Sequence, residues 1–347
     1  KLKIDQELSK TYDSEKTDFL NDINGTKARM KTAREARDFI KQYDSVENFE
    51  VHGYERFVYQ YIRREFPKDI DYNIDQMKIY ALDIEVQCEN GFPNVEEAAE
   101  EMLSITIKDM VTKKFYIWAV RDFETEHEHY VFDSEKDMLK SFLEWWVHHT
   151  PDILTGWNVN LYDVPYIARR LNRILGEKWM RSLSPWNRAN EREIYVQGRK
   201  NYAYDVSGIN ILDYLDLYRK FTYSNQESYR LDHIAFVELG QRKLDHSEYE
   251  NFKDFYTSDW QKFIEYNIQD VELIDRLEDK MKLLELAITM SYDAKVNFED
   301  VYSQVRMWDT MIYNYLADKN VVPPPRKGAR KDEKYAGAYV KEPVPGK

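Results

Sequence analysis

The chain has 347 residues, of which 43% are hydrophobic and 33% charged, and its net charge is −13. It has no long apolar run, which argues against a membrane-spanning helix, and its single cysteine, Cys88, excludes internal disulfide bonds and cysteine-based zinc sites. The acidic balance argues against a general nucleic-acid coat protein but is compatible with a nuclease, because clustered carboxylates serve metal-dependent phosphodiester chemistry.

The first part of the chain, residues 1–78, is predicted to form a small domain. Residues 1–30 are polar and irregular, 26–43 place apolar side chains on one face of a helix, and 54–66 form an aromatic-rich segment that Pro67 closes. The sequence does not begin with Met, so we expect the natural chain to begin upstream.

A different pattern begins at Lys78. Apolar and alternating runs predict strands, a Ser134 cap predicts a helix start, and Gly176 predicts a helix end. The predicted strands are 79–86, 102–108, 114–120 and 152–157, and the predicted helices are 134–149 and 163–175. This order indicates an α/β unit with an antiparallel start and a parallel continuation.

The remaining segments are less regular. Residues 193–206 alternate on both sides of a basic tip at 197–200, which predicts a β-hairpin, and 210–217 lead into a helix. Residues 259–286 have the pattern of one long amphipathic helix. The signal weakens after about residue 290, and 321–331 form a basic, proline-rich connector.

The strand at 79–86 carries two acids, Asp83 and Glu85, in an otherwise apolar run. Residues two apart share one face of a strand, so both carboxylates point the same way. Burying two charges without partners is costly. The pair therefore indicates a divalent metal site, an ion pair with Lys or Arg, or an exposed edge.

Two further acids have the spacing to complete a site with this pair. Asp163 follows a Gly-Trp strand at the start of a helix, where it is either a metal ligand or a helix cap. Tyr266 and Asp270 lie four residues apart, so they share one face of the 259–286 helix. The alternative for that pair is a solvated helix face with a Tyr–Asp hydrogen bond.

The three motifs occur in a fixed order: Asp83-x-Glu85, Asn158-x-x-x-Tyr162-Asp163 and Tyr266-x-x-x-Asp270. This order and context resemble the three exonuclease motifs of the DEDD proofreading superfamily, in its tyrosine subclass. Over most of residues 50–347 the chain is similar to the family B DNA polymerases of T-even-type bacteriophages, through TGWNVNLYDVPYIARRLNRILG, ILDYLDLYRKF, YSNQESYRLDHIA, YNIQDVELID, MSYDAK, MWDTMIYN and GAYVKEP.

The resemblance implies a fold and a division of the chain. The fold is a ribonuclease H-like exonuclease domain, α/β with a mixed central sheet flanked by helices, beside a smaller N-terminal α+β domain. Residues 1–78 would form part of the N-terminal domain, 79–290 the exonuclease domain, and 291–347 a return segment to the N-terminal domain and a linker. The polymerase palm motifs are not in this sequence, and the chain begins short of the family's usual start.

The resemblance also implies a chemistry. Asp83, Glu85, Asp163 and Asp270 would hold two Mg²⁺ or Mn²⁺ ions, and Tyr266 would orient the attacking water. The reaction would be 3′→5′ hydrolysis of DNA that releases nucleoside monophosphates.

DNA contacts are implied for six residues: Phe92, Asn158, Tyr162, Arg199, Lys200 and Lys243. Phe92 would stack on the terminal base or pack as an ordinary loop side chain. Asn158 would hold the terminal nucleotide or order its turn, and Lys243 would approach the phosphate or lie in solvent. The hairpin tip would help to separate primer from template or form a charged turn.

The implied partners are single-stranded DNA, primer-template DNA, the polymerase domains of the same parent chain and, through the full-length protein, a sliding clamp and other replisome proteins. No membrane partner is expected, and the implied location is the cytoplasm of the infected bacterial host. Two alternatives remain open: a non-catalytic nucleic-acid-binding or docking fragment, and an RNA-directed nuclease of the same superfamily.

Overall fold

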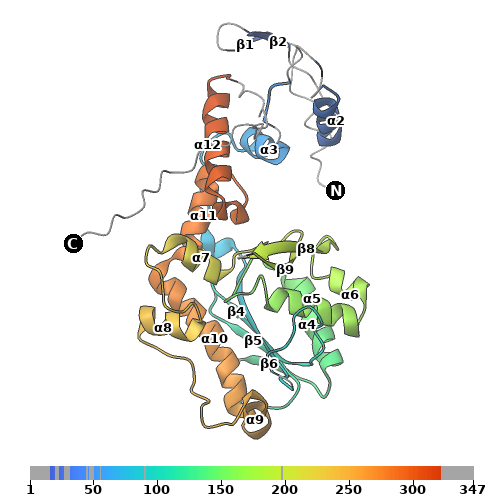
Figure 1. The fold of residues 1–347 in the computed structure, drawn as a ribbon, viewed down its shortest axis with the longest axis vertical. Coiled ribbons are helices and arrows are strands. Elements are labelled where there is room, and N and C mark those ends of the chain that lie inside the picture. Colours follow the sequence, from blue (N-terminus) through green and yellow to red (C-terminus); the bar gives the residue numbers. More distant parts are fainter. Residues whose placement is uncertain are drawn as a thin grey trace, which may run out of the picture. The chain divides into compact units, whose positions relative to one another are not determined.

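The computed structural model describes residues 32–43, 46, 51–54, 56–89, 91–196 and 198–321, and the backbone of 16–19 and 23–26. Most of the predicted proline-rich connector and the GAYVKEP segment lie outside the described residues. The chain divides into two compact units (Figure 1), which are Lys1–Pro67 with Asp309–Lys347, and Lys68–Trp308.

The smaller unit combines segments from both parts of the sequence. The Tyr54 hydroxyl lies 2.8 Å from that of Thr310, and the rings of Tyr54 and Tyr313 stack with centroids 4.3 Å apart. The predicted first helix is confirmed over Ala33–Tyr43. The elements are β1 Lys16–Phe19, β2 Ile23–Thr26, α2 Ala33–Tyr43, α3 Phe57–Glu65 and α12 Gln304–Asp318, in which the division between the units falls.

The larger unit is built on a six-stranded mixed sheet in the order β10–β7–β3–β4–β5–β6. β3 pairs antiparallel with β4 and parallel with β7, as predicted. The strands are β3 Ile79–Val86, β4 Met102–Asp109, β5 Phe115–Ala119, β6 Glu128–Val131, β7 Ile153–Thr155 and β10 Asn210–Ile211. β6 and β10 were not predicted, because two to four residues are too few to show an alternating pattern.

Helices cover both faces of this sheet. Helices α4 and α5 share one apolar core with it, and α9 and α10 share another on the opposite face. The predicted N-cap of α4 is confirmed, because the Ser134 side chain accepts from the Asp137 N–H. The helices are α4 Glu135–His149, α5 Asp163–Ile174, α6 Glu177–Arg181, α7 Tyr214–Phe221, α8 Leu231–Leu239, α9 Phe252–Ser258, α10 Trp260–Met281 and α11 Leu283–Ala294.

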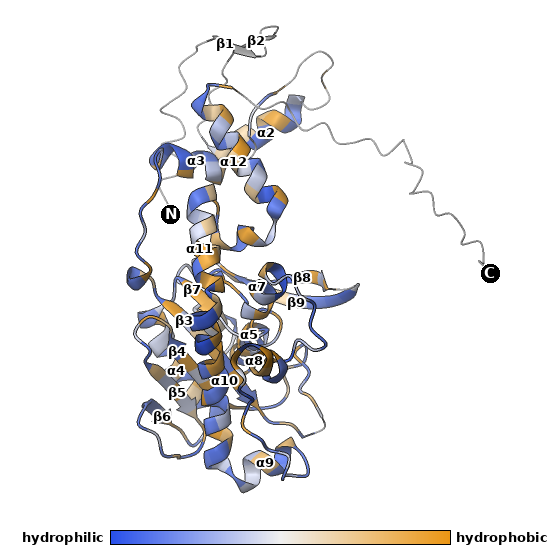
Figure 2. Ribbon diagram, turned by 90° about the vertical axis from the view of Figure 1, so that its left-hand side faces the viewer, coloured by the Kyte–Doolittle hydropathy of each residue, from blue (hydrophilic) through white to orange (hydrophobic). Residues whose placement is uncertain are grey.

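The predicted hairpin is also present, as strands β8 Ala189–Val196 and β9 Arg199–Val206. These strands form a separate two-stranded sheet, which extends from the central sheet and is hydrophilic over most of its length (Figure 2).

The sheet carries a line of polar side chains on the face that α10 covers. Leu82 lies in the core beneath α4 and α5, so its neighbours Asp83 and Glu85 point to the opposite face. In the β3–β4 register Asp83 lies opposite Thr106, and Glu85 lies opposite Ser104. We call this line the polar seam, and its members are Asp83, Glu85, Ser104, Thr106 and Lys108.

The prediction of one helix over 259–286 is wrong at its end. The helix stops at Met281, and Lys282 adopts a left-handed conformation with φ of 57° before α11 begins. The Glu278 carboxylate accepts from the backbone N–H groups of Leu284 and Glu285, in the first turn of α11, over 3.0 and 3.1 Å. A side-chain acceptor for the unsatisfied N–H groups allows a second helix to start there.

A buried ion pair ties α5 to α4 and to the loop before β4. The Arg170 guanidinium donates to both oxygens of the Glu135 carboxylate. It also donates to the carbonyls of Ala98 and Ala99 over 3.0 and 2.9 Å. Glu135 also accepts from the Met102 N–H over 2.9 Å. The two side chains are only 3% and 5% exposed, so every charge in this cluster depends on its partner.

We expect Arg170→Met to lower the free energy of unfolding by about 3–5 kcal/mol, because it leaves the Glu135 charge buried without a partner. Urea unfolding followed by circular dichroism measures the loss. The matched control is Arg181→Met, whose surface pair with Glu177 is largely exposed and should change stability by no more than about 0.5 kcal/mol. Equal stability of the two variants would contradict the prediction.

Candidate active site

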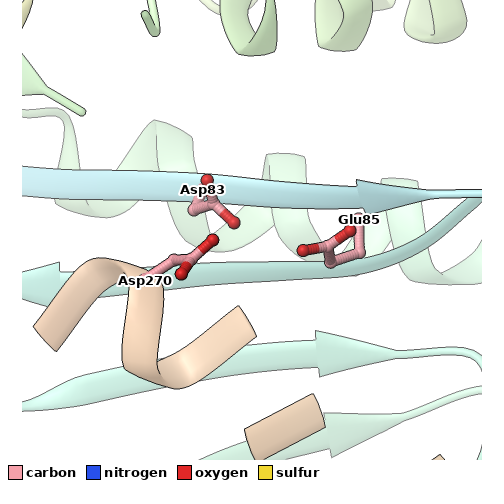
Figure 3. Close-up of side chains that lie close together, drawn as sticks. All are labelled: Asp83, Glu85 and Asp270. Atoms are coloured by element: carbon pink, nitrogen blue, oxygen red, sulfur yellow. The ribbon is translucent and has the colours of Figure 1, made fainter. Parts of the chain in front are cut away.

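The polar seam places two of the predicted acids together on β3. Glu85 is 8% exposed, and Asp83 is partly exposed. Both carboxylates point toward α10, which lies against β3 and β4 (Figure 3). Neither acid forms an ion pair with Lys or Arg among the described residues, which leaves the metal interpretation standing.

Helix α10 supplies the third acid, Asp270, which is 3% exposed. One carboxylate oxygen each from Asp83, Glu85 and Asp270 lie within 4.8 Å of one another. Three of the four predicted acids therefore form one cluster, in which two come from a strand and one comes from a helix 185 residues or more away in the sequence.

The fourth acid, Asp163, is the first residue of α5 and is 2% exposed. Its Oδ1 accepts from the Ile84 N–H over 3.1 Å, on the strand between Asp83 and Glu85. The N-cap position belongs to Tyr162, which makes no side-chain cap. Asp163 is thus tied to β3 beside the cluster, although it is not within the group of three.

Tyr266 and Asp270 meet through a lysine. Lys243 forms an ion pair with Asp270, and its ammonium donates to the Tyr266 hydroxyl over 2.9 Å. Its side chain is 21% exposed, so Lys243 is not a solvated surface lysine. Its position beside the acids makes it part of the candidate site rather than a remote contact.

The site is strongly acidic and poorly solvated. Burial raises the pKa of Asp83 and of Glu85 well above the ordinary carboxylate range, and the Asp270 charge raises both further. Burial also raises the pKa of Asp163 to about 8, despite its backbone hydrogen bonds. The pKa of Asp270 is raised by burial, which outweighs the opposing Lys243 charge. One ammonium therefore does not balance these carboxylates.

The arrangement fits a divalent cation. Oδ1 of Asp270 is buried and has no hydrogen-bond partner in the described part of the chain. A buried carboxylate oxygen without a partner is costly, and a cation would satisfy it. The donors in the cluster are all carboxylate oxygens, which are the ligands that hard divalent cations prefer.

Two aromatic side chains lie next to each other near the start of α5. Phe92 is 83% exposed in the loop that follows β3, and its ring centroid lies 5.1 Å from that of Tyr162. Tyr162 immediately precedes Asp163. A largely exposed aromatic ring supported by a second ring is suited to stacking against a base, and the alternative of a packed loop side chain does not fit its exposure.

The loop before Asp163 is organised by Asp213, which the sequence analysis did not single out. The Asp213 carboxylate accepts the backbone N–H groups of Asn158 and Asn160 over 3.0 and 2.9 Å, and it also caps α7. Asn158 has a left-handed φ of 66°. Asn158 therefore takes part in ordering the turn. The pattern Asp-Tyr-Leu-Asp at the start of α7 was the available signal for Asp213.

Arg199 and Lys200 begin β9 at the hairpin tip, and both are exposed. Lys200 forms an ion pair with Glu193 of β8 over 2.6 Å. The structure places these two residues on a separate hairpin and does not include them in the acidic cluster.

Asn267 is the other residue that the sequence analysis passed over. It is fully buried, lies next to Tyr266 on α10, and donates to Asp83 over 2.6 Å. Its position three residues before Asp270 placed it near the same helix face, which was the one signal in the sequence.

Acids on the central strand of a mixed sheet, completed by an acid on a helix packed across it, define a ribonuclease H-like nuclease domain. Residues 40–234 match the family described as DNA polymerase family B, exonuclease domain, and the chain belongs to this family. The match ends before Lys243 and α10, whose place in the site is given by their contacts with Asp270 and Asp83.

Several curated polymerases are similar to the chain. It is 30% identical to a DNA-directed DNA polymerase of Escherichia phage RB69 over 93% of its length, and 31% identical to that of Enterobacteria phage T4 over 91%. In both cases it spans 38% of the relative. It is also 24% identical to a putative DNA polymerase of Frog virus 3 over 92% of its length and 33% of the relative. Within the described residues, no helix is long and apolar enough to cross a membrane.

We expect Asp83→Asn to raise the thermal unfolding midpoint of the protein in EDTA by about 2–4 °C. A raised carboxylate pKa means that folding disfavours the charged form, so a neutral amide removes that cost at pH values above the unfolded pKa. Calorimetry at pH 8 measures the midpoint. The control is Asp133→Asn at an exposed position, which should leave the midpoint unchanged. A lower midpoint for Asp83→Asn would contradict the expectation.

Proposed function

We propose that the chain is the proofreading 3′→5′ exonuclease portion of a replicative DNA polymerase. It hydrolyses the 3′-terminal phosphodiester of single-stranded or mispaired DNA and releases nucleoside monophosphates. The observation that carries the proposal is the cluster of Asp83, Glu85 and Asp270, whose oxygens lie within 4.8 Å of one another in a member of this exonuclease family.

Asp83, Glu85, Asp163 and Asp270 are proposed to hold two Mg²⁺ or Mn²⁺ ions. Bound at this cluster, such ions would polarise the scissile phosphate and lower the pKa of water. The group of three would hold one ion. Asp163 lies outside that group, with its carboxylate bonded to the Ile84 N–H, and it is proposed to help bind the second ion. The raised pKa values of the acids favour a cation over an empty site, because bound positive charge relieves their repulsion.

Tyr266 is proposed to orient the attacking water. Burial raises the pKa of its phenol, so the hydroxyl stays protonated at neutral pH. Lys243 donates to the phenol oxygen, which leaves the phenol hydrogen free to be donated to a water or a DNA oxygen beside Asp270. Tyr266 therefore acts as a hydrogen-bond donor, and Lys243 holds both it and Asp270.

Phe92 is proposed to stack on the 3′-terminal base, with Tyr162 supporting it. Asn158, in the turn that Asp213 orders, is proposed to contact the terminal nucleotide. Arg199 and Lys200 are proposed to contact phosphates where hairpin β8–β9 helps to separate primer from template.

The polymerase domains that supply the primer terminus are proposed to lie in the same parent chain, because this chain spans 38% of its phage relatives. The parent protein is proposed to work with a sliding clamp and other replisome proteins in the cytoplasm of a bacterial host.

We expect the protein to shorten 5′-labelled single-stranded DNA from its 3′ end when Mg²⁺ is present, and EDTA to stop the reaction. Asp83→Asn, purified in the same way, should lose this activity because a cation ligand is lost. Denaturing gels and chromatography of the released monophosphates measure the reaction.

Full-length products from the parent protein would refute the enzyme proposal and favour a non-catalytic binding fragment. Equal degradation by the parent and Asp83→Asn would place the active site elsewhere. Faster cleavage of RNA than of DNA of the same sequence would indicate an RNA-directed nuclease.

We expect Phe92→Ala to raise the KM for single-stranded DNA about ten- to hundredfold, because one base–aromatic stack contributes about 1–3 kcal/mol. Steady-state kinetics measure the change. The control is Tyr223→Ala, which removes another fully exposed ring and should leave KM unchanged. An unchanged KM for Phe92→Ala would show that the ring does not contact the substrate.

A further inference from the structure

A single amide connects the acids to the second strand of the polar seam. Asn267 is fully buried between α10 and the sheet. Its Oδ1 accepts from the hydroxyls of Thr106 over 2.6 Å and Ser104 over 3.0 Å, and its Nδ2 donates to Asp83 over 2.6 Å. Ser104 and Thr106 are themselves fully buried.

The chemistry of the three partners allows only one orientation of this amide when Asp83 is charged. An ionised carboxylate only accepts hydrogen bonds, so the NH₂ group must face Asp83. The amide oxygen then faces β4, where two hydroxyls are available as donors. If the amide were reversed, its oxygen would face the Asp83 carboxylate, and two buried acceptors would repel each other.

The β3–β4 register brings the two hydroxyls of β4 close to the acids of β3, so one amide can join them. Thr106 lies directly opposite Asp83, and Ser104 lies opposite Glu85. Within the described residues both hydroxyls donate to Asn267, and no hydrogen bond joins either of them to Asp83, Glu85 or Asp270. Their effect on Asp83 therefore passes through Asn267.

We infer that Asn267 is a positioning residue that aims the Asp83 carboxylate into the cation site, and that the hydroxyls of Ser104 and Thr106 set its orientation. The inference rests on the proposed function, because it concerns the same site. It assigns a role in cation binding to two residues of β4 whose hydroxyls donate to Asn267 and not to a proposed cation ligand.

The test compares Ser104→Ala/Thr106→Val with Thr106→Ser. The double variant removes both hydroxyls from the amide oxygen and keeps the volume at position 106. We expect its Mn²⁺ affinity to fall about 10- to 100-fold, which is the usual effect of losing a group that orients a metal ligand. Thr106→Ser keeps the hydroxyl and loses a methyl group, so it should bind Mn²⁺ like the parent even though it is less stable.

Mn²⁺ affinity is measured by electron paramagnetic resonance on the protein without DNA, with thermal unfolding and DNA cleavage recorded for each variant. The matched control is Thr310→Val, which removes a buried hydroxyl from the other compact unit and should leave Mn²⁺ affinity unchanged. A purely structural role would make affinity follow stability, and Thr106→Ser would then be impaired.

Parent-like Mn²⁺ affinity in the double variant, beside weak binding by Asp83→Asn, would overturn this inference and leave the proposed function standing. A parent protein that neither binds Mn²⁺ nor shortens DNA would overturn the proposed function and the inference together.

Discussion

In the described part of the chain, four clustered carboxylates have one ammonium beside them, and this excess of negative charge is the constraint on which the domain is built. Desolvation raises the pKa of Asp83, Glu85, Asp163 and Asp270, and the Asp270 charge raises the pKa of the other three further, so the site opposes folding when it holds no cation. The apolar cores on the two faces of the sheet offset this cost, and they hold β3 and α10 close enough for the acids to meet. A divalent cation would convert the repulsion into binding energy.

Helix α10 shows how local this deficit of positive charge is. Five residues beyond Asp270, Asp275 lies between Lys108 and Lys113 over 2.6 and 2.5 Å, and Lys108 also pairs with Glu272. There the two lysines neutralise the two acids of α10. At the site end, one Asp270 oxygen pairs with Lys243, and the other has no hydrogen-bond partner among the residues that the structure describes. Along one helix, Glu272 and Asp275 are therefore neutralised by lysines, whereas the acids around Asp270 carry excess negative charge. This is the pattern expected when a bound ligand supplies the missing positive charge.

The residues near the acidic cluster indicate how a substrate would be held. Phe92 and Tyr162 present aromatic surface near the start of α5, and Asp213 holds the turn that carries Asn158. These groups would hold the end of a DNA strand, whereas the acids would act on one phosphodiester bond. The chain belongs to the exonuclease-domain family of the family B DNA polymerases, and it spans 38% of the length of its phage relatives.

Local periodicity was sufficient for much of this result. The two-residue period of a strand placed Asp83 and Glu85 on one face, the i, i+4 spacing placed Tyr266 with Asp270, and Ser134 marked a helix start, because these features depend only on neighbours in the chain. Contacts between distant segments were decided by packing. The Asp163 bond to Ile84, the Lys243 pair with Asp270 and the Asn267 link to Asp83 each join different elements. The break between α10 and α11 at Lys282 is accompanied by hydrogen bonds from α11 to Glu278, which periodicity does not reveal. A sequence shows which face of an element a residue occupies, and only the folded arrangement shows what that face meets.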